Sequence, residues 1–253
     1  NYYNSNWGLQ NGKVRNASVS NGNKPMLMLS HQYQVTNTSK LNTTLLYTFG
    51  KSGFTALNWN DAPNPRPNYY RYLPSYQLDP NFAAQVADEL RNDINKRQIN
   101  WDALYQTNYA ANDIVRNVNG ITGNDVAGLR SRYILEDRII NTTKYNFNST
   151  LNTSVSENVT FTAGVTYQSQ KNHYYKEIVD LLGGEFYVDV NQFGERDFPT
   201  NFGAGQNDLN NPNRLVGVGD KHGYNYDLNI KRGSVWLQGV FKFPKFDVVV
   251  STE

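Results

Sequence analysis

The chain has 253 residues, of which only 18% are charged, and its net charge of +2 gives no electrostatic footprint for nucleic acid. It contains no cysteine, which excludes disulfide bonds and every cysteine-based metal or redox centre. No run of 18 apolar residues is present, so no transmembrane helix is expected. Two residue types are unusually frequent: Tyr occurs 18 times and Asn 36 times.

The first long strand is predicted by a period-two alternation of apolar and polar residues. Within residues 41–49, Leu45 and Tyr47 fall on one face, and Asn42 and Thr44 fall on the other. Strict alternation over such a length indicates a β-strand with two different environments.

The rest of the chain repeats this alternation, and its strands are joined by two kinds of connection. One further strand, around His31, is predicted before the turn at 36–40, and others are predicted at about 130–153, 159–168, 224–241 and 246–253. Short polar turns lie at 36–40, 154–158 and 243–245, whereas long irregular loops lie at about 58–128 and 176–221. A strand over 130–153 spans on the order of 70 Å, while soluble strands usually run about 3–10 residues. Long strands with alternating short and long connections are typical of an outer-membrane β-barrel.

The first long loop contains one predicted helix, over residues 79–94. Asp79 is a suitable N-cap and Pro80 suits the first helical turn. Its apolar residues recur every four positions and form one narrow stripe: Phe82, Val86, Leu90 and Ile94. We expect this stripe to dock on Trp101 and Leu104.

The two faces of the strands suggest what each face meets. In a barrel the apolar face meets lipid, and the neutral Asn, Thr, Gln and Ser face lines a wet or plugged lumen. Tyr and Trp suit the interfacial girdles of such a barrel, although aromatic residues are also good strand formers in general. The candidates for girdle positions are Tyr47, Phe49, Tyr167, Tyr174, Tyr175, Tyr224 and Tyr226.

No catalytic constellation is found. His31, His173 and His222 are far apart in sequence, and the neighbouring carboxylates Glu136 and Asp137 give no sign of a shared cleft. An oxygen-rich stretch at 208–220 is suited to a cation, but solvated loop polarity is the simpler interpretation. We therefore predict no enzyme activity, no metal site and no cofactor.

One segment, residues 56–76, is unusually rich in proline and aromatic residues. Prolines stiffen an extended loop, so its rings are suited to stack on a sugar, a peptide or a partner. The alternative, a loop that folds over its own rings, is equally compatible with the sequence. The predicted contact residues are Trp59, Arg66, Tyr69, Tyr70, Tyr72, Tyr76 and Trp101.

This segment leads to a resemblance. Residues 64–76, together with 6–13, 184–187 and 217–221, resemble the barrel of TonB-dependent outer-membrane receptors, in particular the SusC-like and carboxypeptidase-regulatory-domain type. The resemblance implies a barrel of about 22 strands filled by a plug and uptake driven by the TonB complex. The chain begins without Met and ends within a strand-like run, so we expect a piece of a longer chain that lacks the plug.

The prediction is thus an all-β, antiparallel transmembrane β-barrel segment over 1–253, with about six long strands. The implied location is the bacterial outer membrane, and the implied function is transport of a glycan, peptide or metal chelate. The implied partners are the rest of the barrel and its plug, the TonB complex, lipid or lipopolysaccharide, and a surface lipoprotein lid or other outer-membrane proteins. The alternatives are a non-transporting subunit of a larger outer-membrane assembly, a different barrel such as a passive porin or adhesin, a soluble carbohydrate-binding β module, and a β-rich hydrolase.

Overall fold

The computed structural model describes residues 5–253 and is built mainly from antiparallel strands, with 54% strand and 18% helix. The all-β prediction is confirmed at this level. None of the described helices is long and apolar enough to cross a membrane.

The chain divides into two compact units, which we describe separately. The loop unit comprises Asn1–Asn21, Gly53–Ile139 and Tyr175–Asn225, and the hairpin unit comprises Gly22–Ser52, Ile140–Tyr174 and Tyr226–Glu253. Four long strands contribute residues to both units: β5 (Ser39–Trp59), β8 (Tyr133–Ser156), β9 (Val159–Asp180) and β12 (Lys221–Lys242).

These long strands form the main sheet, together with β3 (Ser20–Asn23), β4 (Met26–Thr36) and β13 (Asp247–Thr252). The strand order is β13-β12-β9-β8-β5-β3, and β4 also pairs with β5. Residues 24 and 25 separate β3 from β4, and Pro25 lacks the N–H that a continuous strand would present. In the part of the chain that the structure describes, the sheet is open, and β13 lies at one edge.

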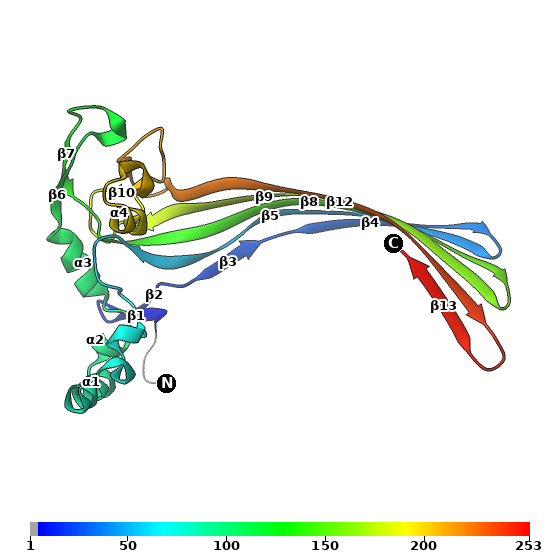
Figure 1. Ribbon diagram of the computed structural model, residues 1–253, viewed down its shortest axis with the longest axis horizontal. Coiled ribbons are helices and arrows are strands. Elements are labelled where there is room, and N and C mark those ends of the chain that lie inside the picture. The colour runs from blue at the N-terminus through cyan, green and yellow to red at the C-terminus, as the bar shows by residue number, and fades with distance from the viewer. Residues whose placement is uncertain (1–4) are drawn as a thin grey trace. The chain divides into compact units, whose positions relative to one another are not determined.

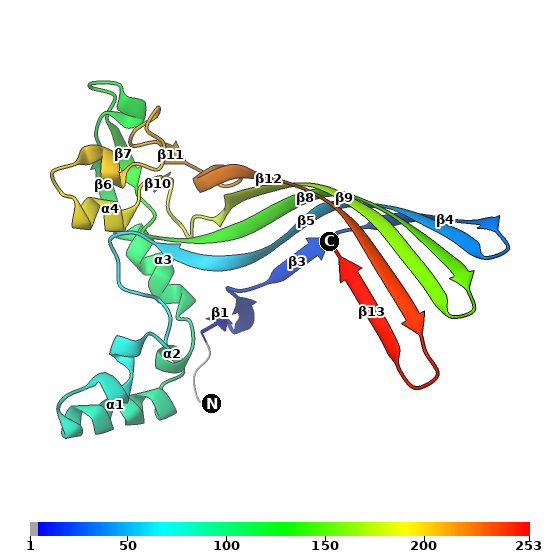
Figure 2. The same cartoon turned by 45° about the vertical axis from the view of Figure 1, so that its right-hand side comes forward.

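The hairpin unit consists of tight hairpins whose turns match the predicted ones (Figures 1 and 2). Leu27 lies opposite Tyr47 and Leu29 lies opposite Leu45 in the β4–β5 ladder. The Tyr47 ring also stacks on Tyr145 of β8, with centroids 4.8 Å apart. Cross-strand pairs of this kind are what stabilise a sheet.

No large apolar side chain is buried in the hairpin unit, all of whose residues are described. Met26, Leu27, Met28 and Leu29 at the start of β4 are 62–69% exposed. This unit is a sheet without a protein core of its own.

The loop unit adds three two-stranded sheets, β1-β2, β6-β7 and β10-β11, and several helices, most of them labelled in Figure 1. The short strands are β1 (Trp7–Gln10), β2 (Lys13–Asn16), β6 (Asn112–Val115), β7 (Val126–Leu129), β10 (Tyr187–Val188) and β11 (Leu215–Val216). The α-helices are α1 (Pro80–Asn92), α2 (Ile94–Arg97), α3 (Trp101–Tyr109) and α4 (Gln192–Asp197). Single 3₁₀ turns are found at Tyr70–Tyr72, Pro74–Tyr76, Val118–Gly120 and Phe202–Gly205.

Two sequence signals explain local elements here. Asn11 and Gly12 have φ of 50° and 74°, the left-handed conformations that a two-residue turn between β1 and β2 requires. Asp79 accepts hydrogen bonds from the backbone N–H groups of Asn81 and Phe82, so the predicted N-cap of α1 is confirmed.

The loop unit contains all of the large buried apolar side chains of the described chain, and most of them belong to three clusters. In β8, Tyr133 and Leu135 enter the cluster around Trp101, whereas Ile134 enters a second cluster with Ile178. Because successive side chains of a strand point to opposite faces, β8 is covered on both faces within this unit. Strand β9 extends to Asp180, so the second long loop begins after residue 180 and later than the predicted residue 176.

Candidate binding site in the loop unit

The predicted tyrosines lie together and pack on one another. The Tyr69 ring lies 4.8 Å from Tyr70 and 5.1 Å from Tyr72, and Tyr70 lies 5.3 Å from Tyr76, all in edge-to-face contact. Tyr70, Tyr72 and Tyr76 nevertheless remain 39–52% exposed. The segment therefore folds over its own rings, and three of these rings keep exposed surface.

Trp59 and Trp101 have different environments. The Arg66 guanidinium lies 5.2 Å from the centroid of the Trp59 ring, a cation–π distance. Trp101 is completely buried, and its Nε1–H donates to the Arg15 carbonyl at 3.1 Å. Trp101 is thus a core residue and offers no surface to a partner.

The first cavity of the loop unit, which we call the helix cavity, has a volume of about 520 Å³. Its apolar walls come from the proline-rich segment, α1 and α3, and include Tyr72, Leu90 and Leu104. Arg66 and Lys96 add charge to its lining. Two of the seven predicted contact residues, Arg66 and Tyr72, therefore meet at one cavity.

The stripe of α1 behaves differently from the prediction. Leu90 is buried, but Phe82 is 49% exposed and Ile94 belongs to α2. Phe82 and Leu90 line the helix cavity together with Leu104, as predicted, whereas the apolar cluster that contains Trp101 and Leu104 includes no residue of the stripe. The stripe thus forms one wall of a cavity and does not dock on Trp101.

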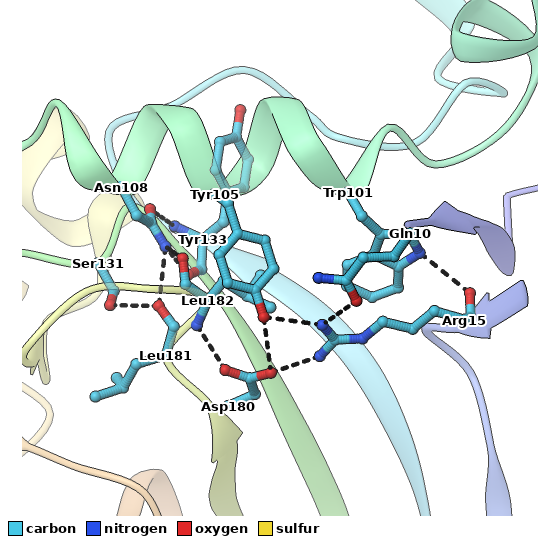
Figure 3. A network of polar contacts seen from close by, with 10 residues as sticks. All are labelled: Gln10, Arg15, Trp101, Tyr105, Asn108, Ser131, Tyr133, Asp180, Leu181 and Leu182. Atoms are coloured by element: carbon cyan, nitrogen blue, oxygen red, sulfur yellow. Dashed lines mark hydrogen bonds and ion pairs between the residues drawn. The ribbon is translucent and has the colours of Figure 1, made fainter. Parts of the chain in front are cut away.

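Asn108 fixes α3, another wall of that cavity, to the rest of the unit (Figure 3). Its side chain is fully buried. The Nδ2 group donates to the carbonyls of Tyr133, Leu181 and Leu182 at 2.8–3.1 Å, and Oδ1 accepts from the N–H groups of Arg132 and Tyr133. One amide therefore joins α3 to β8 and to the segment that follows β9.

Arg15 provides a second attachment in the same region (Figure 3). Its guanidinium contacts Asp180, donates to the Tyr105 hydroxyl at 3.0 Å and to Gln10 at 2.9 Å, and lies 4.2 Å from the Trp101 ring centroid. These contacts connect β2 with α3 and the end of β9. Both networks hold the wall of the helix cavity in position.

A third group of charges surrounds the buried carboxylate of Glu136. Its oxygens lie 2.7 Å from Arg138 Nε, 3.3 Å from Lys176 Nζ and 3.2 Å from His222 Nε2, and accept from Asn58 Nδ2 at 2.8 Å. Burial favours the protonated acid, but the close contact with His222 and the charge of Lys176 outweigh it and hold the pKa of Glu136 at about 2. Glu136 is therefore ionised at neutral pH.

Sequence reasoning missed this cluster. Glu136, Lys176 and His222 lie on β8, β9 and β12. The short turn at 154–158 predicts that β8 and β9 are neighbours, but the long loop between β9 and β12 leaves the place of His222 open. The one available signal was Glu136 itself, a charged residue in the apolar part of a predicted strand. A carboxylate buried at such a position requires partners.

No group of three or more His, Asp or Glu side chains among the described residues is arranged to hold a metal ion. In the oxygen-rich stretch, Asp208 accepts from the N–H groups of Asn210 and Asn211, and Asp220 accepts from the N–H of Gly217. These carboxylates thus form local turns.

Comparison with known proteins adds no assignment. No protein-family profile, no curated protein and no solved structure gives a significant match to the chain.

Proposed function

We propose that this chain is part of the wall of an outer-membrane β-barrel, in a receptor of the TonB-dependent kind that takes up a glycan, peptide or metal chelate. In this proposal the hairpin unit lies in the bilayer and the loop unit lies outside it. The observation that carries the proposal is the absence of any large buried apolar side chain in the described hairpin unit.

A single-layer sheet of this kind requires another medium on its apolar face. In water, such a sheet would expose a continuous apolar surface that includes Leu27, Leu45 and Leu237, and large patches of this kind mark membrane or protein contacts. Lipid would cover this face without a second protein layer. A soluble carbohydrate-binding module would instead pack two sheets around a core.

The unpaired edges of the sheet are a second argument for a larger barrel. An open edge in lipid leaves backbone N–H and C=O groups without partners, so β4 and β13 require neighbouring strands from the rest of the barrel. The plug and the TonB complex would then supply the gate and the energy for transport.

Capture of the nutrient would begin at the loop unit. Exposed tyrosines and the helix cavity provide ring surfaces, with Arg66 and Lys96 beside them. A surface lipoprotein lid is a suitable partner for such a mouth.

One observation favours the second candidate, a non-transporting subunit of a larger outer-membrane assembly. Phe193, Phe198, Phe202 and Leu209 in and around α4 are 57–71% exposed. Apolar side chains exposed so close together in sequence are typical of a surface that binds another protein.

The absence of cysteine makes a direct test possible. The variants Leu45→Cys and Thr44→Cys place single thiols at adjacent positions, whose side chains point to opposite faces of β5. In outer membranes that contain the full-length protein, we expect a lipid-soluble maleimide to label the Leu45→Cys variant and a charged, water-soluble maleimide to label the Thr44→Cys variant. Equal labelling of both variants by the charged reagent, with the protein in the soluble fraction, would reject the barrel.

A further inference from the structure

A second cavity of the loop unit, which we call the polar cavity, is separate in its lining from the helix cavity and has a volume of about 350 Å³. Cavities of this size suit small ligands. Its lining combines rings, such as Trp59 and Tyr224, with amide side chains and the cationic side chain of Lys176. Rings beside convergent polar groups are the usual composition of a ligand site.

Asn60 supplies the second, independent observation. It lines this cavity and is only 2% exposed. Its Oδ1 accepts from Arg130 Nη2 at 2.8 Å, and because arginine can only donate, this contact fixes the orientation of the amide. Among the described residues, the Asn60 Nδ2 group then has no acceptor. A buried donor without a partner costs free energy, so it indicates a site for an acceptor on a ligand.

The net charge of the neighbouring Glu136 cluster also indicates a ligand that carries acceptor groups. Glu136 is the one carboxylate in contact with both Arg138 and Lys176. Lys176 is 17% exposed and lines the polar cavity. The nearby Asp189 adds no free negative charge, because it is paired with Arg214. Within this cluster, one positive charge therefore remains in excess, and an anionic ligand would balance it.

The rings define the rest of the ligand. Tyr224 lies beside Lys176, whose Nζ is 5.1 Å from the ring centroid, and Trp59 offers a second ring in the same lining. Flat ring faces favour stacking against another ring or against the apolar face of a sugar. We propose that the polar cavity binds a small ligand that carries a carboxylate on an aromatic or sugar ring, with the carboxylate accepting from Asn60 Nδ2 and lying near Lys176. This proposal does not depend on the barrel.

The test uses isothermal titration of the intact purified protein with three probes: glucuronate, benzoate and neutral glucose. We expect saturable binding of at least one acid and affinity for glucose lower by about tenfold or more, because hydrogen bonds to a charged acceptor are the stronger ones. Preference for glucuronate identifies an acidic sugar, and preference for benzoate identifies an aromatic acid. Glucose binding as tightly as glucuronate, or no saturable binding of either acid, would overturn the proposal.

Two variants locate the site. Asn60→Asp keeps an oxygen for Arg130 but replaces the free donor by a second, negative acceptor, so acid affinity should fall by about tenfold or more. Asn68→Asp adds the same charge at an exposed position of the loop unit and is the matched control. Lys176→Gln should bring the affinity for the acid down to that for glucose. Equal acid binding by Asn60→Asp and the unmodified protein, or equal losses in Asn60→Asp and Asn68→Asp, would reject this location.

Discussion

The hairpin unit and the loop unit are stabilised in opposite ways. The loop unit contains three main apolar clusters and buried polar networks around Asn108 and Glu136. The hairpin unit has sheet hydrogen bonds and cross-strand pairs but no buried large apolar side chain, and many of its apolar side chains are exposed. The loop unit thus buries its apolar side chains within itself. The hairpin unit does not, so its stability depends on the medium that covers its apolar face. Substitutions in the two units should therefore respond differently to detergent, lipid and pH.

The largest effect is expected at Asn108. Asn108→Ala removes the partners of five backbone groups, several of them buried, and should destabilise the loop unit by about 4 kcal/mol. Hydrogen exchange should show faster exchange throughout the loop unit and unchanged protection in the hairpin unit. Gln106→Ala, an exposed position on the same helix, is the control. Equal loss of protection in both units would contradict the separation between them.

The next largest effect is expected for a charge placed on the apolar face of the hairpin unit. Leu45→Arg puts a charge on the proposed lipid face and should destabilise the protein in bilayers by about 3 kcal/mol. Thr44→Arg, one residue away on the other face, should cost much less. Urea unfolding in lipid vesicles measures both variants. Similar costs for the two would show that lipid does not cover the Leu45 face.

The stability of the loop unit should depend on pH through the ionisation of Glu136. The pKa of its carboxyl is about 2 in the folded protein, below the ordinary value of 4.5. Its stabilising contribution is therefore complete above about pH 4.5 and is lost as the pH falls towards 2, in total about 3 kcal/mol. Hydrogen exchange of β8 and β12 between pH 5 and pH 2 measures this loss. In Glu136→Gln, the same stretch of the profile should be flatter, and an unchanged slope would assign the loss to other carboxyl groups.

The smallest effect concerns the N-cap of α1. Asp79→Ala removes the acceptor of two backbone N–H groups and should destabilise the helix by about 1 kcal/mol. Asp79→Asn keeps an acceptor and should restore most of the loss. Limited proteolysis within α1 measures the difference, and equal cleavage of both variants would contradict the capping role.

The sequence predicted the two units unequally well. Alternation located the hairpins because each face of those strands keeps one kind of side chain, apolar or polar, along most of its length, and the Asp79–Pro80 signal located α1. It missed α3, where Asn108 is buried in place of an apolar residue, although Asn100 is a usable cap signal. The Glu136 cluster depends on strand neighbours, and Trp101 was assigned to a surface because aromatic residues suit both cores and binding sites.

Asn108 also bears on the order in which the chain folds. The hairpin between β4 and β5 closes over two residues, whereas Asn108 reaches Leu181 across 73 positions of the sequence. Contacts between distant segments form slowly, since a long loop must first be closed. We therefore expect the hairpins to form first and the loop unit to close only after β9 has formed. A refolding chain should acquire strand protection well before the Trp101 side chain is shielded from water.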